Sequence, residues 1–337
     1  MADQQWDKLW FKTADITSAV VIESEELKEV VTSFTANVFR VGRIVGFPAF
    51  LAGLSARYQS AIDLARLEEL GRLFLSEPES KDVELLNRLR ERKELHIKNS
   101  MIADIEQNKM GDFLRQGGDL FKEIMSLYDT DEDAKSIFNS LILSAWTTME
   151  TMLGDLWETS VNVRPTHLSV MDGKRQATKK SRADDDDGEQ IDTKSIPLKD
   201  VYRHNLDLSK SLGTILKGNL KFVNLGSVVK AYLQSFYTDA DEIHKLIQEE
   251  SLLALFIMRN AIVHKAGKVD VKFMSERGRA KVALAKWQGL TLHDSIEIDG
   301  NDVRGLIEPA FKTGATLIVE VDKWIKNHPE PRSLYFL

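Results

Sequence analysis

The sequence predicts an all-α protein, folded as a helical bundle. Apolar residues recur at spacings of three and four over much of the 337-residue chain, which is the period of a helix with one buried face. Only 7 prolines and 19 glycines interrupt the chain, which argues against a β-sandwich or a disordered protein. The 43% of hydrophobic residues is enough for a sizeable core, in one large domain or two of ordinary size.

Composition also excludes several classes of protein. The chain has no cysteine, which excludes disulfides, thiol nucleophiles, zinc ribbons and iron–sulfur clusters. The first residues lack a secretory pattern, and the apolar run 41–54 contains Arg43 and Pro48 and is too short to span a bilayer. We therefore expect a soluble, cytoplasmic protein without a membrane segment. The net charge of −7 argues against a general polyanion binder but permits a local basic site.

Residues 1–128 are predicted to form an N-terminal helical region of unknown role. Ser-Glu-Glu at residues 24–26 suits the start of a helix, because acidic residues favour its positive N-terminal end. Pro48 fits the first turn of a second helix over residues 49–75, since that position needs no backbone donor.

A charged helix is predicted next, from about residue 82 to beyond residue 105. Its mixed charges are typical of a solvated face or of the arm of a long hairpin. Gly117-Gly118 and the acidic stretch 129–133 indicate a domain boundary near residue 130.

Residues 129–330 are predicted to form the second domain, which opens with a long helix. Thr130-Asp131-Glu132-Asp133 places a carboxylate three residues after a hydroxyl, as a capping box does. Glu150 is anomalous, because it is a carboxylate amid aromatic and aliphatic neighbours. Two stripes follow at helical spacing: Ile137, Leu141, Ala145, Met149, Met152 and Leu156; and Leu143, Trp146, Glu150, Leu153 and Trp157.

A polar insertion is predicted at residues 164–196. Its basic cluster is compatible with a localisation signal, and Asp184–Asp187 with a divalent cation, but charge blocks of this kind are usually disordered loop. The remaining elements are shorter helices over 210–216 and 225–237, a long helix from about 239 to 267, a small hairpin around 299–301 and a final amphipathic helix over 303–326.

Several familiar catalytic constellations are absent. The sequence has no Gly-x-Gly-x-x-Gly turn, no Gly-Lys-Ser/Thr phosphate loop, no His-Glu-x-x-His and no Gly-x-Ser-x-Gly. No pair of the seven histidines has ligand spacing, so neither catalytic zinc nor another cofactor is expected.

The candidate site lies on the helix around residue 260. Arg259 cannot shed its proton and can hold a phosphate bidentately, while a histidine can give or accept a proton near neutral pH. Asn260 and His264 are four residues apart and share a helix face, whereas Arg259 and His264 are about 140° apart. Metal-free cleavage of RNA by 2′-hydroxyl attack needs little more than these groups.

The local charge agrees with RNA binding. Between residues 259 and 286 there are eight Lys or Arg, among them Lys265, Lys268 and Lys272, against two acidic residues, which gives +6 within an acidic protein. An alternative needs no catalysis: a buried ion pair between Arg259 and Glu150 beside a satisfied His264 explains the same residues.

The run Arg259-Asn260-Ala261-Ile262-Val263-His264-Lys265-Ala266-Gly267-Lys268-Val269-Asp270 resembles the signature of the HEPN superfamily (higher eukaryotes and prokaryotes nucleotide-binding). There an Arg, usually followed by a polar residue, precedes a His by four to six positions, and His-x-x-Gly-x-Val-Asp is similar to larger, defence-associated members. Residues 141–150 resemble the first long helix of those proteins. The resemblance covers about residues 131–327, and residues 1–125 match nothing recognisable.

The resemblance implies an HEPN-like helical bundle that dimerises, so that two motifs build one composite site. It implies a metal-independent endoribonuclease of a toxin–antitoxin or antiviral-defence system, with RNA as substrate and an antitoxin or defence-system partner. By carry-over, Arg259 would bind phosphate, Asn260 would orient it, His264 would act as acid or base, and Glu150 would support them. The alternative is a non-catalytic HEPN module that binds nucleotide, RNA or a partner protein.

Overall fold

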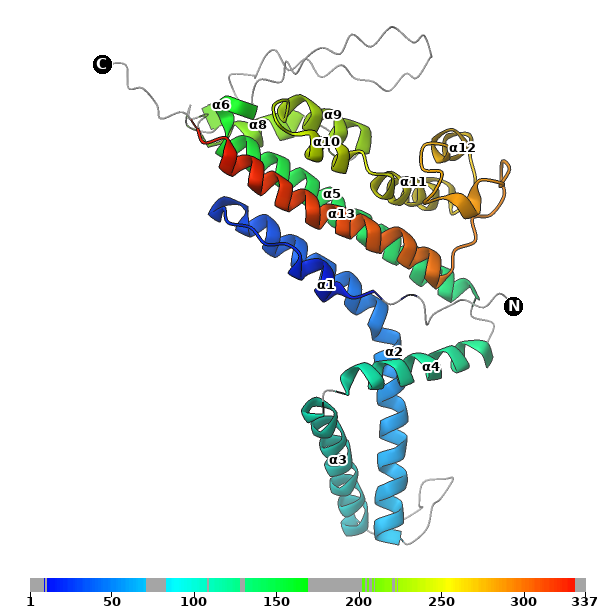
Figure 1. Cartoon of the computed structure of the whole chain (residues 1–337). Helices are drawn as coiled ribbons and strands as arrows, with labels where there is room; N and C mark the ends of the chain where they lie inside the picture. Colours follow the sequence, from blue (N-terminus) through cyan, green and yellow to red (C-terminus); the bar gives the residue numbers. More distant parts are fainter. Residues whose placement is uncertain are drawn as a thin grey trace. The chain divides into compact units, whose positions relative to one another are not determined.

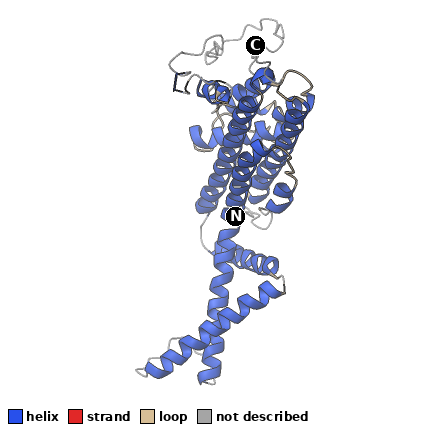
Figure 2. Cartoon of the chain, turned by 90° about the vertical axis from the view of Figure 1, so that its left-hand side faces the viewer, coloured by secondary structure: helices blue, strands red, loops and turns tan. Residues whose placement is uncertain are grey.

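The computed structural model describes residues 9, 11–70, 83–107, 109–127, 131–168, 202–203, 205, 208, 210–219, 222 and 224–330. Regular structure in these residues is helical, apart from one isolated antiparallel bridge between Lys268 and Ser295 (Figure 2). The all-α fold class is therefore confirmed. Thr130 of the predicted capping box, and most of the predicted insertion at 164–196, lie outside the described residues.

The helices are named in chain order. They are α1 (Thr13–Ser18), the 3-10 turn η2 (Glu25–Leu27), α2 (Lys28–Leu70), α3 (Val83–Glu106), α4 (Met110–Leu127), α5 (Asp131–Val163), α6 (Pro165–Leu168), α8 (Leu212–Asn219), α9 (Leu225–Ser235), α10 (Asp241–Ile247), α11 (Glu250–Lys265), α12 (Val271–Arg277), η3 (Ala285–Trp287) and α13 (Gly300–Asn327).

Packing divides the chain into two compact units. Unit 1 takes in the described residues of Met1–Trp10, Gly42–Ile137 and Asp299–Asn301. Unit 2 takes in those of Phe11–Val41, Phe138–Ile298 and Asp302–Leu337. The helices α2 and α5 therefore each contribute to both units. The predicted domain boundary after residue 128 stays a prediction.

Unit 2 is built around α5 and α13, which lie side by side and run in the same direction (Figure 1). On one side the first part of α2 packs on α13, where the rings of Phe34 and Phe311 meet edge to face at 6.2 Å. On the other side α11 packs on α5, where the rings of Trp146 and Phe256 are 5.0 Å apart. This layering buries a large apolar core.

The predicted pattern of α5 is confirmed almost throughout. In the first stripe every member from Leu141 onward is buried, and Ile137 is half-buried. In the second stripe Trp146 and Trp157 are buried, whereas Glu150 is half-buried. A helix buried on most of its circumference is what a central element of a bundle requires.

Two predictions about the C-terminal part are wrong. The helix expected over residues 239–267 is two helices, because Gln248 closes α10 by donating to the His244 carbonyl (2.8 Å) and Glu249 is extended. The hairpin expected around residues 299–301 is absent from this described segment, since Gly300 already opens α13. The final helix itself is confirmed, three residues longer at its start than predicted.

The prediction that Pro48 lies in the first turn of a second helix is wrong. This proline lies inside α2, which runs unbroken from Lys28 to Leu70, and does not start a helix. The missed signal is a buried stripe that continues at helical spacing on both sides of the proline: Val41, Val45, Ala49 and Ala52. By length and composition alone, one helical segment among the described residues, Glu25–Glu69, could cross a membrane; 33% of its apolar window is buried.

The helices α2 and α3 form an antiparallel hairpin, which was one of the two interpretations of the charged pattern. Arg88 and Arg92 of α3 each pair with Glu69 of α2 at 3.3 Å, and His96, one turn further on, lies 3.2 Å from Glu68. The order of these contacts along the two helices fixes their opposite directions. Because no described residue of α3 is fully buried, these pairs contribute to the alignment of the hairpin.

The helix α4 crosses α2 at very short range within unit 1. Gly117 of α4 lies against the backbone of Ala49, and Gly53 of α2 lies against the ring of Phe113. Small residues at both contacts allow the two backbones to approach. Both glycines of the pair 117–118 lie inside this helix, and Gly117 is a packing residue.

Candidate functional site

The helix α11 carries the predicted site at its C-terminal end. Its first turns are buried, from Leu252 to Met258 with few exceptions, against the core of unit 2. Further along, Arg259 and Asn260 are half-buried, and His264 in the last turn is exposed. The polar residues thus lie where the helix leaves the core, and the cost of burying a full charge is avoided.

Two of the polar side chains on this helix are connected by a hydrogen bond. Arg259 Nη1 donates a hydrogen bond to Asn260 Oδ1 at 2.9 Å, which turns the guanidinium toward its neighbour. Because α11 is continuous to Lys265, Asn260 and His264 share one face, as the spacing predicted. The amide therefore stands between the cation and the imidazole and can orient a bound phosphate.

The residues after His264 fold as a helix stop and a return. Ala266 and Gly267 both have positive φ, +49° and +74°, and the backbone N–H of each donates to the Ala261 carbonyl. Val269 then pairs with the segment around residue 293, and Asp270 caps α12 by accepting from the Phe273 N–H at 2.7 Å. Glycine at the second left-handed position lowers the strain of this turn.

Glu150 does not meet Arg259 within the chain. The described residues contain no ion pair between them. Ser251 at the start of α11 bonds Thr313 at 3.0 Å, and the neighbouring Gly314 lies against Met149 of α5, so Glu150 is level with the start of α11. Since α11 runs antiparallel to α5 (Figure 1), the Cα atoms of Glu150 and Arg259 are about 10 Å apart along the helix axes.

The non-catalytic alternative required a buried ion pair between Arg259 and Glu150, and the described residues do not form that pair. Arg259 and Glu150 are each only half-buried, and His264 is open to solvent. The supporting role expected for Glu150 stays a prediction that this geometry does not favour within one chain.

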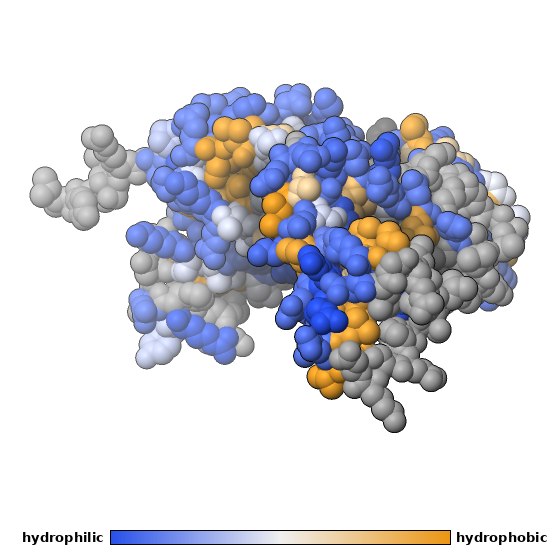
Figure 3. All heavy atoms as spheres, turned by 90° about the horizontal axis from the view of Figure 1, so that it is seen from below, coloured by the Kyte–Doolittle hydropathy of each residue, from blue (hydrophilic) through white to orange (hydrophobic). Residues whose placement is uncertain are grey.

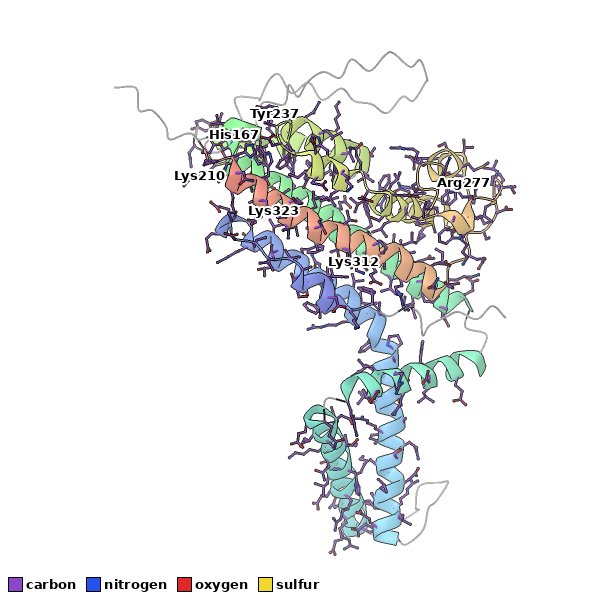
Figure 4. All side chains as sticks on the ribbon, viewed as in Figure 1. His167, Lys210, Tyr237, Arg277, Lys312 and Lys323 are labelled. Atoms are coloured by element: carbon purple, nitrogen blue, oxygen red, sulfur yellow. The ribbon has the colours of Figure 1, made fainter. Side chains whose placement is uncertain are left out.

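The basic segment after α11 has two kinds of cation. Lys265, Lys268 and Lys272 are all exposed, as binding to a strand of RNA requires. Arg277 instead donates to the carbonyls of Trp287 and Leu290, at 3.0 and 2.7 Å, and so holds the loop after α12 (Figure 4). At least one cation of this +6 segment therefore stabilises the fold.

Sequence reasoning missed Glu276 and Arg279 at the end of α12. Burial raises the pKa of the half-buried Glu276 carboxyl, against the opposing pull of Lys272 and Arg279. Glu276 is one of only two carboxylates in a segment with eight cations, and this was the signal in the sequence that could have identified it. Among the described residues, no group of three His, Asp or Glu side chains is placed to hold a metal ion.

Comparison of the chain with protein-family models, with curated proteins and with solved structures finds no match.

Proposed function

We propose that the chain is a metal-independent endoribonuclease of the toxin or antiviral-defence type, with an HEPN-like domain. Support comes from one observation: an exposed His264 shares a helix face with Asn260, which is bonded to a half-buried Arg259 at the point where α11 leaves the core. This arrangement offers a fixed cation, a polar amide and a titratable group to a ligand arriving from solvent.

The chemistry follows from these groups. Arg259 holds the scissile phosphate through two N–H donors and stabilises the charge that builds on it. The 2′-oxygen attacks phosphorus while one imidazole takes its proton, and the 5′-oxygen leaves with a proton from a second imidazole. The products are a 2′,3′-cyclic phosphate and a 5′-hydroxyl, so protons and bonds balance without a metal ion.

Two imidazoles are supplied by two copies of the chain. A symmetric dimer brings two motifs to one axis, so that one His264 acts as base and the other as acid. The exposed lysines Lys265, Lys268 and Lys272 bind the flanking strand. We place the activity in the cytoplasm, under control of an antitoxin or a defence-system partner.

The test compares wild type with Arg259→Ala and His264→Ala on single-stranded RNA in EDTA. Wild type is expected to cleave and to leave cyclic phosphate ends, while each variant loses at least about 100-fold in rate. His293→Asn is the matched control, because it removes another exposed imidazole and asparagine tolerates the positive φ of 72° at that position. Cleavage by His264→Ala at the wild-type rate rejects the assignment.

The alternative function is a non-catalytic module that binds nucleotide, RNA or a partner protein through the same face. The half-buried Arg259–Asn260 pair suits phosphate binding without any reaction. RNA binding that needs Arg259, but no cleavage by wild type under any metal condition, selects this alternative.

A further inference from the structure

A cavity of about 450 Å³ lies in unit 2 beside the start of α11. Its floor is apolar and comes from α9 and α11, with Leu225, Leu253 and Phe256. Its rim is charged and comes from the α10–α11 junction and the end of α12, with Glu249, Glu276 and Arg279. An apolar floor with a few polar groups at the rim, in this size range, is typical of small-molecule sites.

The Glu276 side chain is half-buried at the edge of this cavity. In the part of the chain that the structure describes, no hydrogen bond or ion pair engages its oxygens, although Lys272 and Arg279 act on it electrostatically. The adjacent Arg277 fixes this end of α12 through the Trp287 and Leu290 carbonyls. A half-buried acceptor on a fixed helix end can bind a donor from a ligand at little cost in ordering.

The candidate site lies further along α11 than the cavity. Phe256 lines the cavity, and Asn260 lies one helical turn further on the same face, about 6 Å along the axis. The helices α11 and α12 pack against each other, so Glu276 is carried on the neighbouring element. A ligand with a phosphate at Arg259 and a flat apolar group in the cavity would span this distance.

We propose that this cavity binds a nucleobase with an exocyclic amino group, cytosine or adenine or guanine in preference to uracil. The inference rests on the proposed function, because the phosphate of the same nucleotide is placed at Arg259. The apolar floor receives the faces of the base, the Glu276 carboxylate accepts from its amino group, and Arg279 lies near a flanking phosphate. The same chemistry suits a base of an RNA strand or a free nucleotide.

Binding is measured with the His264→Ala protein, so that the ligand stays intact. Its affinities for a 12-nucleotide cytidine strand and a matched uridine strand are compared, with cytidine monophosphate as the free ligand. The cytidine strand is expected to bind about tenfold more tightly than the uridine strand. If the base belongs to a strand, the strand also binds at least tenfold more tightly than the monophosphate; equal affinities identify a free nucleotide as the ligand.

Glu276→Gln in the same background tests the residue. Its amide keeps the shape but can donate to a uracil carbonyl as well as accept from an amino group, so the tenfold ratio is expected to fall to about twofold. Glu242→Gln removes the same charge from an exposed residue outside this cavity and should leave the ratio unchanged.

The outcomes separate this inference from the proposed function. Equal affinity for the two strands, no binding of either, or an unchanged ratio in Glu276→Gln overturns the base site. A protein that cleaves cytidine and uridine strands equally is still a nuclease but has no such site. A protein that prefers cytidine yet never cleaves retains the base site and loses the nuclease.

Discussion

The two units of the chain bury different kinds of side chains. Unit 2 encloses large ones, among them Trp146, Trp157, Tyr232, Phe236 and Phe311, each 1% exposed or less. Unit 1 buries mostly small ones on α2, such as Ala61 and Ala65, and leaves larger apolar residues of that helix exposed: Ile44, Phe47, Leu51, Tyr58, Leu64 and Leu67. Apolar side chains stand among polar ones on the face seen in Figure 3.

This difference indicates which unit can hold a precise site. Hydrophobic stabilisation scales with the apolar area buried, so unit 2 has the deeper free-energy minimum for its size. The candidate residues on α11 gain a fixed backbone from it. Unit 1 depends more on a close helix crossing and on ion pairs, which are weaker per contact.

Trp157→Ala should have the largest effect. The side chain is fully buried, its ring lies 5.3 Å from that of Phe222, and its Nε1–H donates to Ser235 at 3.1 Å. Truncation leaves a cavity and an unpaired hydroxyl, so we expect a loss of about 3–5 kcal/mol in the free energy of unfolding. Urea titration followed by circular dichroism measures it.

The matched variant is Tyr58→Ala in unit 1, where the residue is 48% exposed. It should cost less than about 1 kcal/mol. Equal losses in the two variants would mean that the units do not differ in the way their cores suggest.

The sequence allowed most of the helices to be predicted, but not where long ones continue. The spans of α3, α5 and α13 followed from charge pattern and apolar periodicity. Pro48 misled because its preference for a first turn is a local rule, whereas the buried stripe on both sides of it acts over the whole of α2. Tertiary burial outweighed the local signal.

The candidate site was predicted in part for a related reason. The face shared by Asn260 and His264 depends only on helical spacing, so the sequence was sufficient. The separation of Glu150 from Arg259 depends on α5 and α11 being antiparallel, and the cavity beside Glu276 depends on α12 folding back on α11. Neither arrangement can be predicted from the local sequence.

Gly117→Ala tests the close helix crossing of unit 1. A Cβ at this position would lie 2.0 Å from the Ala49 carbonyl oxygen and 3.1 Å from the Gly53 nitrogen. Both obstacles are backbone atoms, so α4 must move, and we expect a loss of about 1–3 kcal/mol. Gly111→Ala in the same helix meets nothing within 4 Å and should gain up to about 1 kcal/mol from helix propensity. Denaturation midpoints compare the two; destabilisation by both would exclude the contact as the cause.

Glu69→Gln tests the ion pairs of the α2–α3 hairpin. It removes a carboxylate that pairs with both Arg88 and Arg92, and the Glu69 side chain is only 17% exposed. We expect a loss of about 1 kcal/mol at low ionic strength that shrinks toward zero in 1 M salt, because mobile ions screen surface charges. Glu25→Gln, which breaks an exposed pair with Lys28, should change stability by a few tenths of a kcal/mol or less.

Unit 2 has a charge cluster of its own, in which Lys217 meets Asp155 and Glu158 at 2.8 Å each. Burial acts to raise the pKa of Glu158, but hydrogen bonds from Lys217 and Thr214 outweigh it and the pKa is lowered. A lowered carboxyl pKa contributes stability above its unfolded value of about 4.5, and that stability is lost as pH falls through the folded pKa.

Lys217→Met should therefore cost about 1 kcal/mol or less at pH 7, and the cost should diminish below about pH 4. Thermal melts from pH 7 to pH 3 follow it. A cost that stays constant over this range would assign the effect to lost packing of the lysine stem and not to charge.

His264→Ala should have the smallest effect on folding, within about 0.5 kcal/mol, because the side chain is exposed and makes no hydrogen bond or ion pair with the residues that the structure describes. This small expected change in the free energy of unfolding contrasts with the effect on RNA cleavage, where we expect the same residue to have the largest effect. Replacing such a residue does not destabilise the fold. Its identity can therefore be set by its role in the reaction, while the packed part of α11 holds its backbone in place. A drop of 2 kcal/mol or more in the urea titration would instead show that His264 is structural, and loss of cleavage in that variant would no longer identify a catalytic group.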